Sequence, residues 1–417
     1  MSSHLRNHLP SATVFLSICL ISGGMPMAAG AESRPDEKPG YSMGGFHLLP
    51  EIEVTGYYDD NIYATKRAKE SDMVAVVSPT INMDSLWERH SLDLGAGAVI
   101  GRYLDNSTED YEDFWFKGDA ELELTEASQI YGGAGYNYNH ESRDSKESAQ
   151  QAADELTTYD ARTLQLGIDQ RWGQTLLKLG TTYEALDYDN VGTLYNDDRD
   201  RKVRGLGLRV SNPIADQTSL YVQGVFNQRR YDDALDQFGY DRDSEGYNAV
   251  FGLSREYRGG HRIEAFVGYL EQEYEDNRFD RLSEPNYGLD LRWFPTGGTK
   301  MTAKLGRSSN ETTEVGSAGY LYTSFDLQLE RKLVSDVLGY LNYNHGLAEF
   351  QDVGREDVTQ SAGVGVKYYM SPKVMITASY SHIDNDSNDQ NSVSPVVGTY
   401  DYTRDLFFIT LRARLAP

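Results

Sequence analysis

The chain has 417 residues, with 39 Lys and Arg against 64 Asp and Glu, which gives a formal net charge of −25. So acidic a chain is a poor match for nucleic acid, and we expect no nucleic-acid partner. Cys19 is its one cysteine, which excludes an intramolecular disulfide and a thiol-based metal site. We expect no cofactor and no bound metal.

Residues 1–31 have the pattern of a cleaved export signal. Arg6 gives a positive start, residues 12–27 are mostly apolar or small, and Ala29-Gly30-Ala31 fits a small-x-small cleavage site. The alternative, a lipoprotein acylated at Cys19, is disfavoured because Ile18, directly before that cysteine, is a poor match to the small residue expected there. We therefore predict export and cleavage after residue 31.

The rest of the chain repeats one unit, an amphipathic β-strand followed by a turn. In residues 361–381, for example, apolar side chains alternate with small or polar ones on both sides of a turn at 370–373, the pattern of a β-hairpin. No later segment resembles a transmembrane helix. We predict eighteen strands, with sixteen as the alternative if two weak segments fail. The predicted ranges are 47–58, 73–84, 90–103, 113–124, 128–140, 157–171, 175–187, 200–211, 218–231, 244–257, 261–275, 284–294, 299–309, 319–332, 336–347, 357–369, 373–383 and 400–415.

The connections between these strands alternate between short and long. Every second one is a few residues, as at 87–89 and 172–174, whereas those between are long and acidic, as at 141–156 and 383–399. Short turns at one end and long loops at the other are typical of an outer-membrane β-barrel, with the short turns in the periplasm. We predict a flexible periplasmic lead-in over 32–46 and a single antiparallel up-and-down barrel over 47–417, in the cell outer membrane. A secreted soluble all-β protein is the alternative fold.

The two faces of the predicted strands differ in polarity. One face is apolar, as in Leu164, Leu166 and Ile168, and suits lipid, while the opposite face carries charge and suits a lumen. The lumen charges nearly balance, so the negative excess falls in the long loops. The basic side chains could form a track for an anionic polysaccharide or a salt-bridge lattice, and the sequence does not decide between the two. The candidate pore-lining residues are Lys117, Arg171, Lys178, Arg209, Arg229, Arg262, Arg292, Lys304, Lys367 and Arg412.

The first predicted hairpin carries a recognisable motif. Its tip reads Tyr58-Asp59-Asp60-Asn61, and a proline, Pro79, lies in the second strand. This resembles the Putative beta-barrel porin 2 family, whose first hairpin has a similar Tyr-Asp-x-Asn-aromatic tip. The resemblance implies an outer-membrane barrel associated with exopolysaccharide or capsule production and export, and not an enzyme.

Two acidic segments could in principle bind a cation. The tip at 58–61 has several oxygen ligands, but Asp and Asn at a turn commonly bond their own backbone, and we favour the turn. Residues 384–389 alternate Asp with Asn or Ser but lack the glycine and glutamate of a calcium loop, so a solvated loop is favoured.

A barrel enzyme is a further alternative. His140, His345 and His382 fall near the long-loop ends of strands, with acids such as Glu141 and Asp384 close by in sequence, and Asp–His pairs can activate water. No nucleophile-elbow or zinc-protease motif is present, so we expect no enzyme.

The sequence thus predicts a channel that takes part in exopolysaccharide or capsule export. A general diffusion or small-solute porin is the alternative, and inward folding of the long loops would favour it. A structural or adhesive barrel is a third possibility. The expected partners are outer-membrane lipid, lipopolysaccharide, polysaccharide and periplasmic export components.

Overall fold

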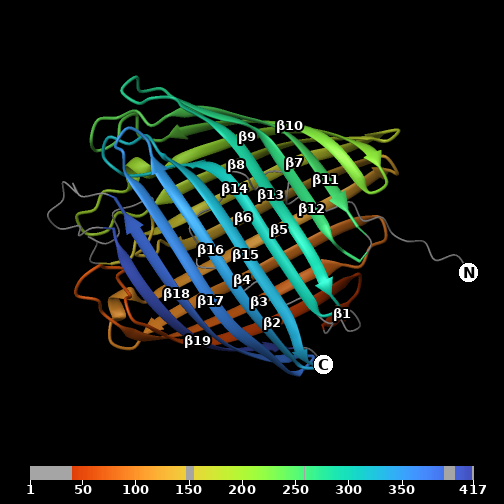
Figure 1. The fold of residues 1–417 in the computed structure, drawn as a ribbon, viewed down its shortest axis with the longest axis horizontal. Coiled ribbons are helices and arrows are strands. Elements are labelled where there is room, and N and C mark those ends of the chain that lie inside the picture. Colours follow the sequence, from red (N-terminus) through yellow and green to blue (C-terminus); the bar gives the residue numbers. More distant parts are fainter. Residues whose placement is uncertain (1–39, 147–154, 258, 389–399, 416–417) are drawn as a thin grey trace, which may run out of the picture.

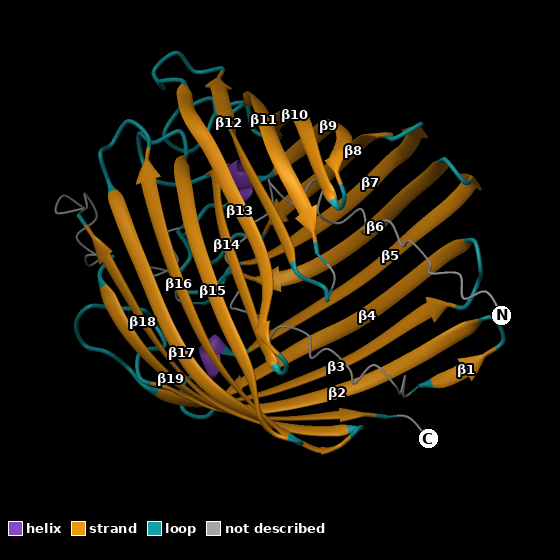
Figure 2. Cartoon of the chain, turned by 45° about the vertical axis from the view of Figure 1, so that its right-hand side comes forward, coloured by secondary structure: helices purple, strands orange, loops and turns teal. Residues whose placement is uncertain are grey.

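The computed structural model of the chain describes residues 40–146, 155–257, 259–388 and 400–415. The predicted signal peptide, with Cys19, and most of the predicted lead-in lie outside these residues. Within them, the chain folds almost entirely into β-strands, with two single-turn 3-10 helices, Ser107–Glu109 and Asp197–Arg199, on the long-loop side (Figure 2). No helix of this part is long and apolar enough to cross a membrane.

The structure confirms the predicted eighteen-strand antiparallel barrel. Each of these strands pairs with its neighbours in sequence, and the last strand pairs with the first barrel strand, from Leu406 opposite Asp59 to Arg414 opposite Glu51. The strands run obliquely around the closed wall (Figure 1). They are β2 (Phe46–Asp59), β3 (Asp72–Ser85), β4 (His90–Tyr103), β5 (Tyr111–Thr125), β6 (Ser128–His140), β7 (Thr158–Trp172), β8 (Thr175–Tyr188), β9 (Arg201–Ala215), β10 (Thr218–Tyr231), β11 (Ser244–Glu256), β12 (Arg262–Tyr274), β13 (Leu282–Thr296), β14 (Thr299–Asn310), β15 (Tyr320–Val334), β16 (Val337–Phe350), β17 (Glu356–Ser371), β18 (Val374–Ser387) and β19 (Tyr402–Arg414).

One additional strand lies where the sequence predicts a flexible lead-in. Residues Tyr41–Met43 form β1, which pairs with the start of β2 through a turn at Gly44, whose φ is +62°. A positive φ is readily available to glycine, so the chain can reverse tightly here. Within the predicted lead-in over 32–46, residues 41–43 thus pair with the barrel through their backbone.

The alternation of side chains along each strand sorts them between lipid and lumen. Leu164, Leu166 and Ile409 have 56%, 57% and 67% of their surface exposed, and this face of the wall is the apolar one. In β7 the charged Asp169 and Arg171 have the opposite parity to Leu164 and Leu166. At the closing seam, Tyr57, Val74 and Leu406 form a buried apolar cluster on the inner side, which packs β19 against β2 and β3.

The β3–β4 pairing has a gap that the sequence explains. Its register runs from Val74 to Val77 and resumes at Thr80, leaving out Ser78 and Pro79. Proline has no N–H to donate to the β-ladder. The proline of the family-like first hairpin therefore leaves a local break in the β3–β4 ladder.

Candidate functional site: the lumen and its outer constriction

Most of the predicted pore-lining cations pair with carboxylates. Arg209 on β9 reaches Glu264 on β12, a strand to which β9 is not adjacent, so the two side chains meet on the concave inner side of the wall. Paired in this way are Lys178 with Asp169 (2.7 Å), Arg209 (2.9 Å) and Arg262 (3.0 Å) with Glu264, Arg229 with Glu311, Lys367 with Glu330 (3.2 Å), and Arg412 with Glu53 (2.7 Å) and Glu51 (3.3 Å).

The remaining four candidates have the same inward-facing parity along their strands, and their side chains are exposed. They are Lys117, Arg171, Arg292 and Lys304, and none of them forms an ion pair with a residue that the structure describes. The lumen thus combines a salt-bridge lattice with cations left open to solvent. A pore-lining role for all ten stays a prediction.

Several inner-face tyrosines lie flat against the wall over glycines of the neighbouring strand. At Gly365, a Cβ atom would stand 2.4 Å from Cζ of Tyr340, and at Gly346 one would stand 2.3 Å from the hydroxyl of Tyr322. Tyr131 over Gly167 and Tyr221 over Gly252 repeat the arrangement. Glycine is needed at these positions because the ring fills the space that any side chain would take.

Basic side chains accompany these rings. The guanidinium of Arg209 lies 3.5 Å from the centroid of Tyr221, and Lys367 Nζ lies 5.1 Å from that of Tyr340. Both distances are within the range of cation–π attraction. Tyr221 and Tyr131 are almost fully buried, whereas Tyr322 and Tyr340 are half-buried and keep part of their surface toward the lumen.

The loop between β14 and β15 folds into the barrel. Its first residue, Glu311, is buried and binds both Arg229 and the hydroxyl of Tyr231 on β10. The guanidinium of Arg242, from the β10–β11 loop, donates to the carbonyl oxygens of Thr312 (2.7 Å) and Ser317 (3.1 Å). The loop is therefore held across the lumen by groups of two other segments.

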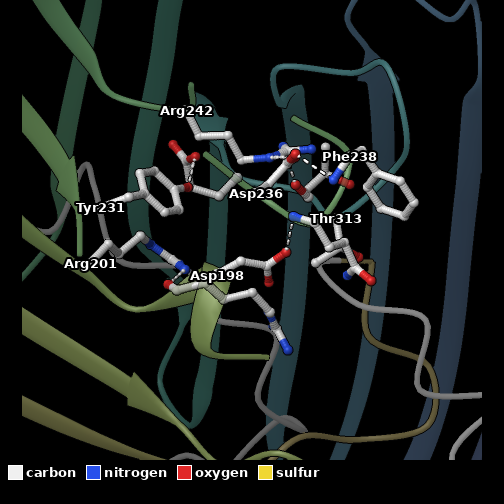
Figure 3. Close-up of a pocket in the computed structure, with 11 residues that line it drawn as sticks. Asp198, Arg201, Tyr231, Asp236, Phe238, Arg242 and Thr313 are labelled. Carbon is white, nitrogen blue, oxygen red and sulfur yellow. Dashed lines mark hydrogen bonds and ion pairs between the residues drawn. The ribbon is translucent and has the colours of Figure 1, made fainter. Parts of the chain in front are cut away.

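Arg201, Tyr231 and Arg242 converge beside this loop on a small pocket (Figure 3). Its volume is about 20 Å³, which is room for about one water molecule. Arg242 is in turn fixed by Asp236, whose Oδ2 lies 2.7 Å from its Nε. This part of the outer end is tightly filled with paired charges.

A second loop meets the first above the lumen. Lys146, in the segment after β6, binds Asn385 of β18 (3.0 Å) and approaches Asp357 of β17 (3.7 Å), while its carbonyl oxygen accepts from the hydroxyl of Thr312 (3.5 Å). Burial lowers the pKa of Lys146 from its usual value. Arg355 is bound to Asp357 and its guanidinium lies 3.3 Å from the Tyr400 ring centroid. Loops from opposite sides of the barrel thus narrow its outer mouth.

The arginines of this outer network were not among the predicted site residues. Arg143, Arg199, Arg242 and Arg355 lie in loops that the sequence analysis treated as acidic and solvated, yet each is at most 6% exposed. One signal was available. Arg199, Arg242 and Arg355 each stand one or two residues before the next strand, within an otherwise acidic loop.

Comparison with known proteins identifies the chain's family. The sequence profile of the Putative beta-barrel porin 2 family matches residues 34–415, nearly the whole chain. The chain belongs to this porin family. Proteins of this porin family lie in the outer membrane, and so does this chain. Among curated proteins, none matches the sequence significantly.

Several solved structures are similar to this chain at low sequence identity. The FrpB iron transporter from Neisseria meningitidis (F5-1 variant) is 7% identical, with a TM-score of 0.51 over 84% of this porin and 65% of FrpB. Pseudomonas aeruginosa OpdK with vanillate is 10% identical, with a TM-score of 0.47 over 88% and 98% of the two chains. P. aeruginosa OccK2 (OpdF) is 9% identical, with a TM-score of 0.48 over 89% and 98%.

The motif tip of the porin's first hairpin binds the chain itself. Asp59 is fully buried and binds Arg404 of β19, and its Oδ1 accepts from the backbone N–H of Asn61 (2.9 Å). The Asn61 amide donates to the carbonyl oxygens of Thr65 (2.8 Å) and Thr403 (2.9 Å). Asp60 accepts from the backbone N–H of Asp405, while Tyr58 lies on the apolar outer face and is 37% exposed. These bonds tie the tip to the closing strand.

The histidines do not pair with the acids that the sequence placed beside them. His140 Nδ1 lies 2.9 Å from both carboxylate oxygens of Asp113, and His382 Nδ1 lies 2.8 Å from Asp405 Oδ1. The expected neighbour Glu141 instead binds Arg199. No cluster of three or more His, Cys, Asp or Glu suited to a metal occurs among the described residues.

Proposed function

We propose that this porin is a conduit that takes part in the export of exopolysaccharide or capsule. The observation that carries the proposal is the set of tyrosines lying flat over glycines on the inner wall, with lumen cations beside them. Sugar rings have apolar faces that pack on aromatic rings, and cations of the lumen suit sugar carboxylates. Lipopolysaccharide around the barrel and periplasmic export components belong to the same proposal.

The outer constriction narrows the exit of a polymer conduit in its resting state. Because Lys146, Arg242 and Glu311 hold loops across the mouth, a chain of sugars has to displace these loops in order to leave. Most of the bonds involved lie in loops, while the strands of the barrel wall pair with one another independently of these loops. The loops can therefore move without opening the wall.

The same inward-folded loops favour a second candidate function, a general diffusion or small-solute porin. A fixed constriction limits the size of a solute that can pass, and the paired charges around it would set its selectivity. On this alternative the loops stay in place during transport, and only small solutes cross.

Single-channel recording separates the two functions. We expect an oligosaccharide of six or more units to block the current of the wild-type chain in a planar bilayer, and the double variant Tyr322→Ala/Tyr340→Ala to be blocked at least about tenfold less tightly, because each ring stack contributes about 1 kcal/mol. The exposed outer-face Tyr247→Ala is the matched control, since Tyr247 lies toward lipid and is 57% exposed. Free passage of small solutes with no block by any oligosaccharide would overturn the export proposal and support the small-solute porin.

A further inference from the structure

The short-turn end of the lumen contains a large cavity that is separate from the outer constriction. Its volume is about 840 Å³, and it lies between the inner ends of β14 to β19 and the turns that join them. Sites for organic ligands commonly measure about 300–1,000 Å³. In an outer-membrane barrel this end faces the periplasm, so the cavity is the first internal space that a molecule from the periplasm meets. We call it the inner vestibule.

The inner vestibule is positively charged although the chain is strongly acidic. Five basic and two acidic side chains line it, a formal charge of 5 − 2 = +3, in a chain of net charge −25. Counting the partners Lys367, Glu51 and Glu53 as well gives 6 − 4 = +2. The five basic residues are Lys300, Lys332, Lys373, Arg412 and Arg414.

The carboxylates near the vestibule are shared, so they do not neutralise it. Glu330 lies 3.2 Å from Lys367 Nζ and 4.0 Å from Lys300 Nζ. Glu51 likewise lies 3.3 Å from Arg412 and 3.2 Å from Arg414. Lys332, which is exposed, forms no ion pair with the residues that the structure describes. When charges of one sign line a cleft with low-dielectric walls, their electric field is concentrated on an ion that enters the cleft.

The vestibule leads to one of the flat rings. Lys367, which shares Glu330 with Lys300, also lies over the ring of Tyr340 at 5.1 Å, and Tyr340 stands opposite Glu330 in the β15–β16 register. Phe294 and Tyr369 add aromatic surface to the vestibule wall. A molecule that enters from the periplasm therefore meets the cations of the vestibule first and the aromatic ring of Tyr340 next.

We propose that the inner vestibule is a binding site for an anionic carbohydrate chain, with Lys332 and Lys373 receiving its carboxylate groups and Tyr340 stacking on a sugar ring. The proposal rests on the export function proposed above and adds to it the charge of the substrate and the end at which it binds. A neutral polysaccharide would gain nothing from five basic side chains around one cavity, whereas a polyuronate presents one carboxylate per sugar.

The test uses the refolded mature chain in planar bilayers, in channels of known orientation, with oligogalacturonate and a neutral glucose oligosaccharide of equal length as probes. We expect oligogalacturonate added on the short-turn side to block at least about tenfold more tightly than the neutral probe, and more tightly than from the loop side. The variant Lys332→Gln/Lys373→Gln is expected to lose most of this preference, and Lys332→Arg/Lys373→Arg to retain it.

The matched control is Lys66→Gln/Lys69→Gln, which also removes two positive charges but at the outer rim, where Lys66 pairs with Asp401 and Lys69 with Asp60. Equal block by both probes, or by oligogalacturonate from both sides, overturns the vestibule site but leaves the sugar conduit standing. Block by neither probe overturns the export function itself. If the double variant does not refold, the wild-type chain still tests the vestibule site. Block by oligogalacturonate should then be tighter from the short-turn side than from the loop side, and this difference should disappear at high salt, because screening weakens binding by exposed cations.

Discussion

The outer constriction can be tested by releasing one of the loops that form it. Arg242→Ala removes the guanidinium that donates to the carbonyl oxygens of Thr312 and Ser317 and that pairs with Asp236. Arg242 is 6% exposed, and the side chain of Asp236 is 3% exposed. We expect the β14–β15 loop to lose its hold on the β10–β11 loop while the barrel stays intact.

The size of the effect follows from the burial of these groups. A hydrogen bond from a charged donor contributes about 1.5–3 kcal/mol, and a buried ion pair that loses one partner costs about 3–5 kcal/mol because the other charge stays desolvated. These terms overlap, since Asp236 regains solvent once the loop moves. A loss of about 3 kcal/mol in the free energy that holds the loop raises the population of its released form by roughly a factor of 10².

Single-channel conductance and limited proteolysis measure this release. The variant is expected to show larger or noisier conductance and faster cleavage within residues 311–319, with an unchanged thermal transition of the barrel. Arg89→Ala is the matched control, because Arg89 pairs with Glu123 at the short-turn end but its side chain is 61% exposed, and exposed pairs contribute little. Conductance and cleavage equal to those of the wild type would refute the view that Arg242 holds the constriction.

Three further predictions concern the wall and the loops. Gly365→Val is expected to push the Tyr340 ring off the wall, since a Cβ would stand 2.4 Å from its Cζ, and to cost about 1–3 kcal/mol in a urea titration; unchanged stability would contradict the close approach. Arg404→Met leaves the fully buried Asp59 without its cation and is expected to cost about 3–5 kcal/mol, which Arg404→Met/Asp59→Asn partly restores; no recovery in the double variant would count against the pair. Burial raises the pKa of Asp200 from 3.8 to about 6, so the folded state holds this proton more tightly than the unfolded state. Its contribution to the free energy of unfolding therefore falls as pH rises from 3.8 to about 6, and Asp200→Asn should remove this slope in urea titrations across that range; an identical slope would show that other groups cause it.

The sequence by itself determined the wall of this porin. The alternation of side chains with period two locates all eighteen strands, because a wall with lipid on one side and water on the other requires opposite polarity at successive residues. The alternation of short and long connections determined which end of the barrel carries the short periplasmic turns and which carries the long loops. Even the break at Pro79 is a local consequence of a missing N–H. The pairing of Tyr41–Met43 with β2 was not predicted, because it spans too few residues to produce a periodic signal.

Only the tertiary structure decided which charges meet. Lys146 and Asn385 lie 239 positions apart in sequence, yet they bind each other across the mouth of the barrel. In the sequence, nothing distinguishes Glu311 from the other acidic residues of the long loops. In the structure it binds Arg229 and the hydroxyl of Tyr231. Strand polarity is set by the residue itself and its nearest neighbours, whereas a salt bridge depends on where closure of the whole barrel places two distant loops. For that reason the sequence could not decide whether the lumen arginines form a salt-bridge lattice or a track for an anionic polysaccharide. The structure places some of them in ion pairs and leaves others exposed.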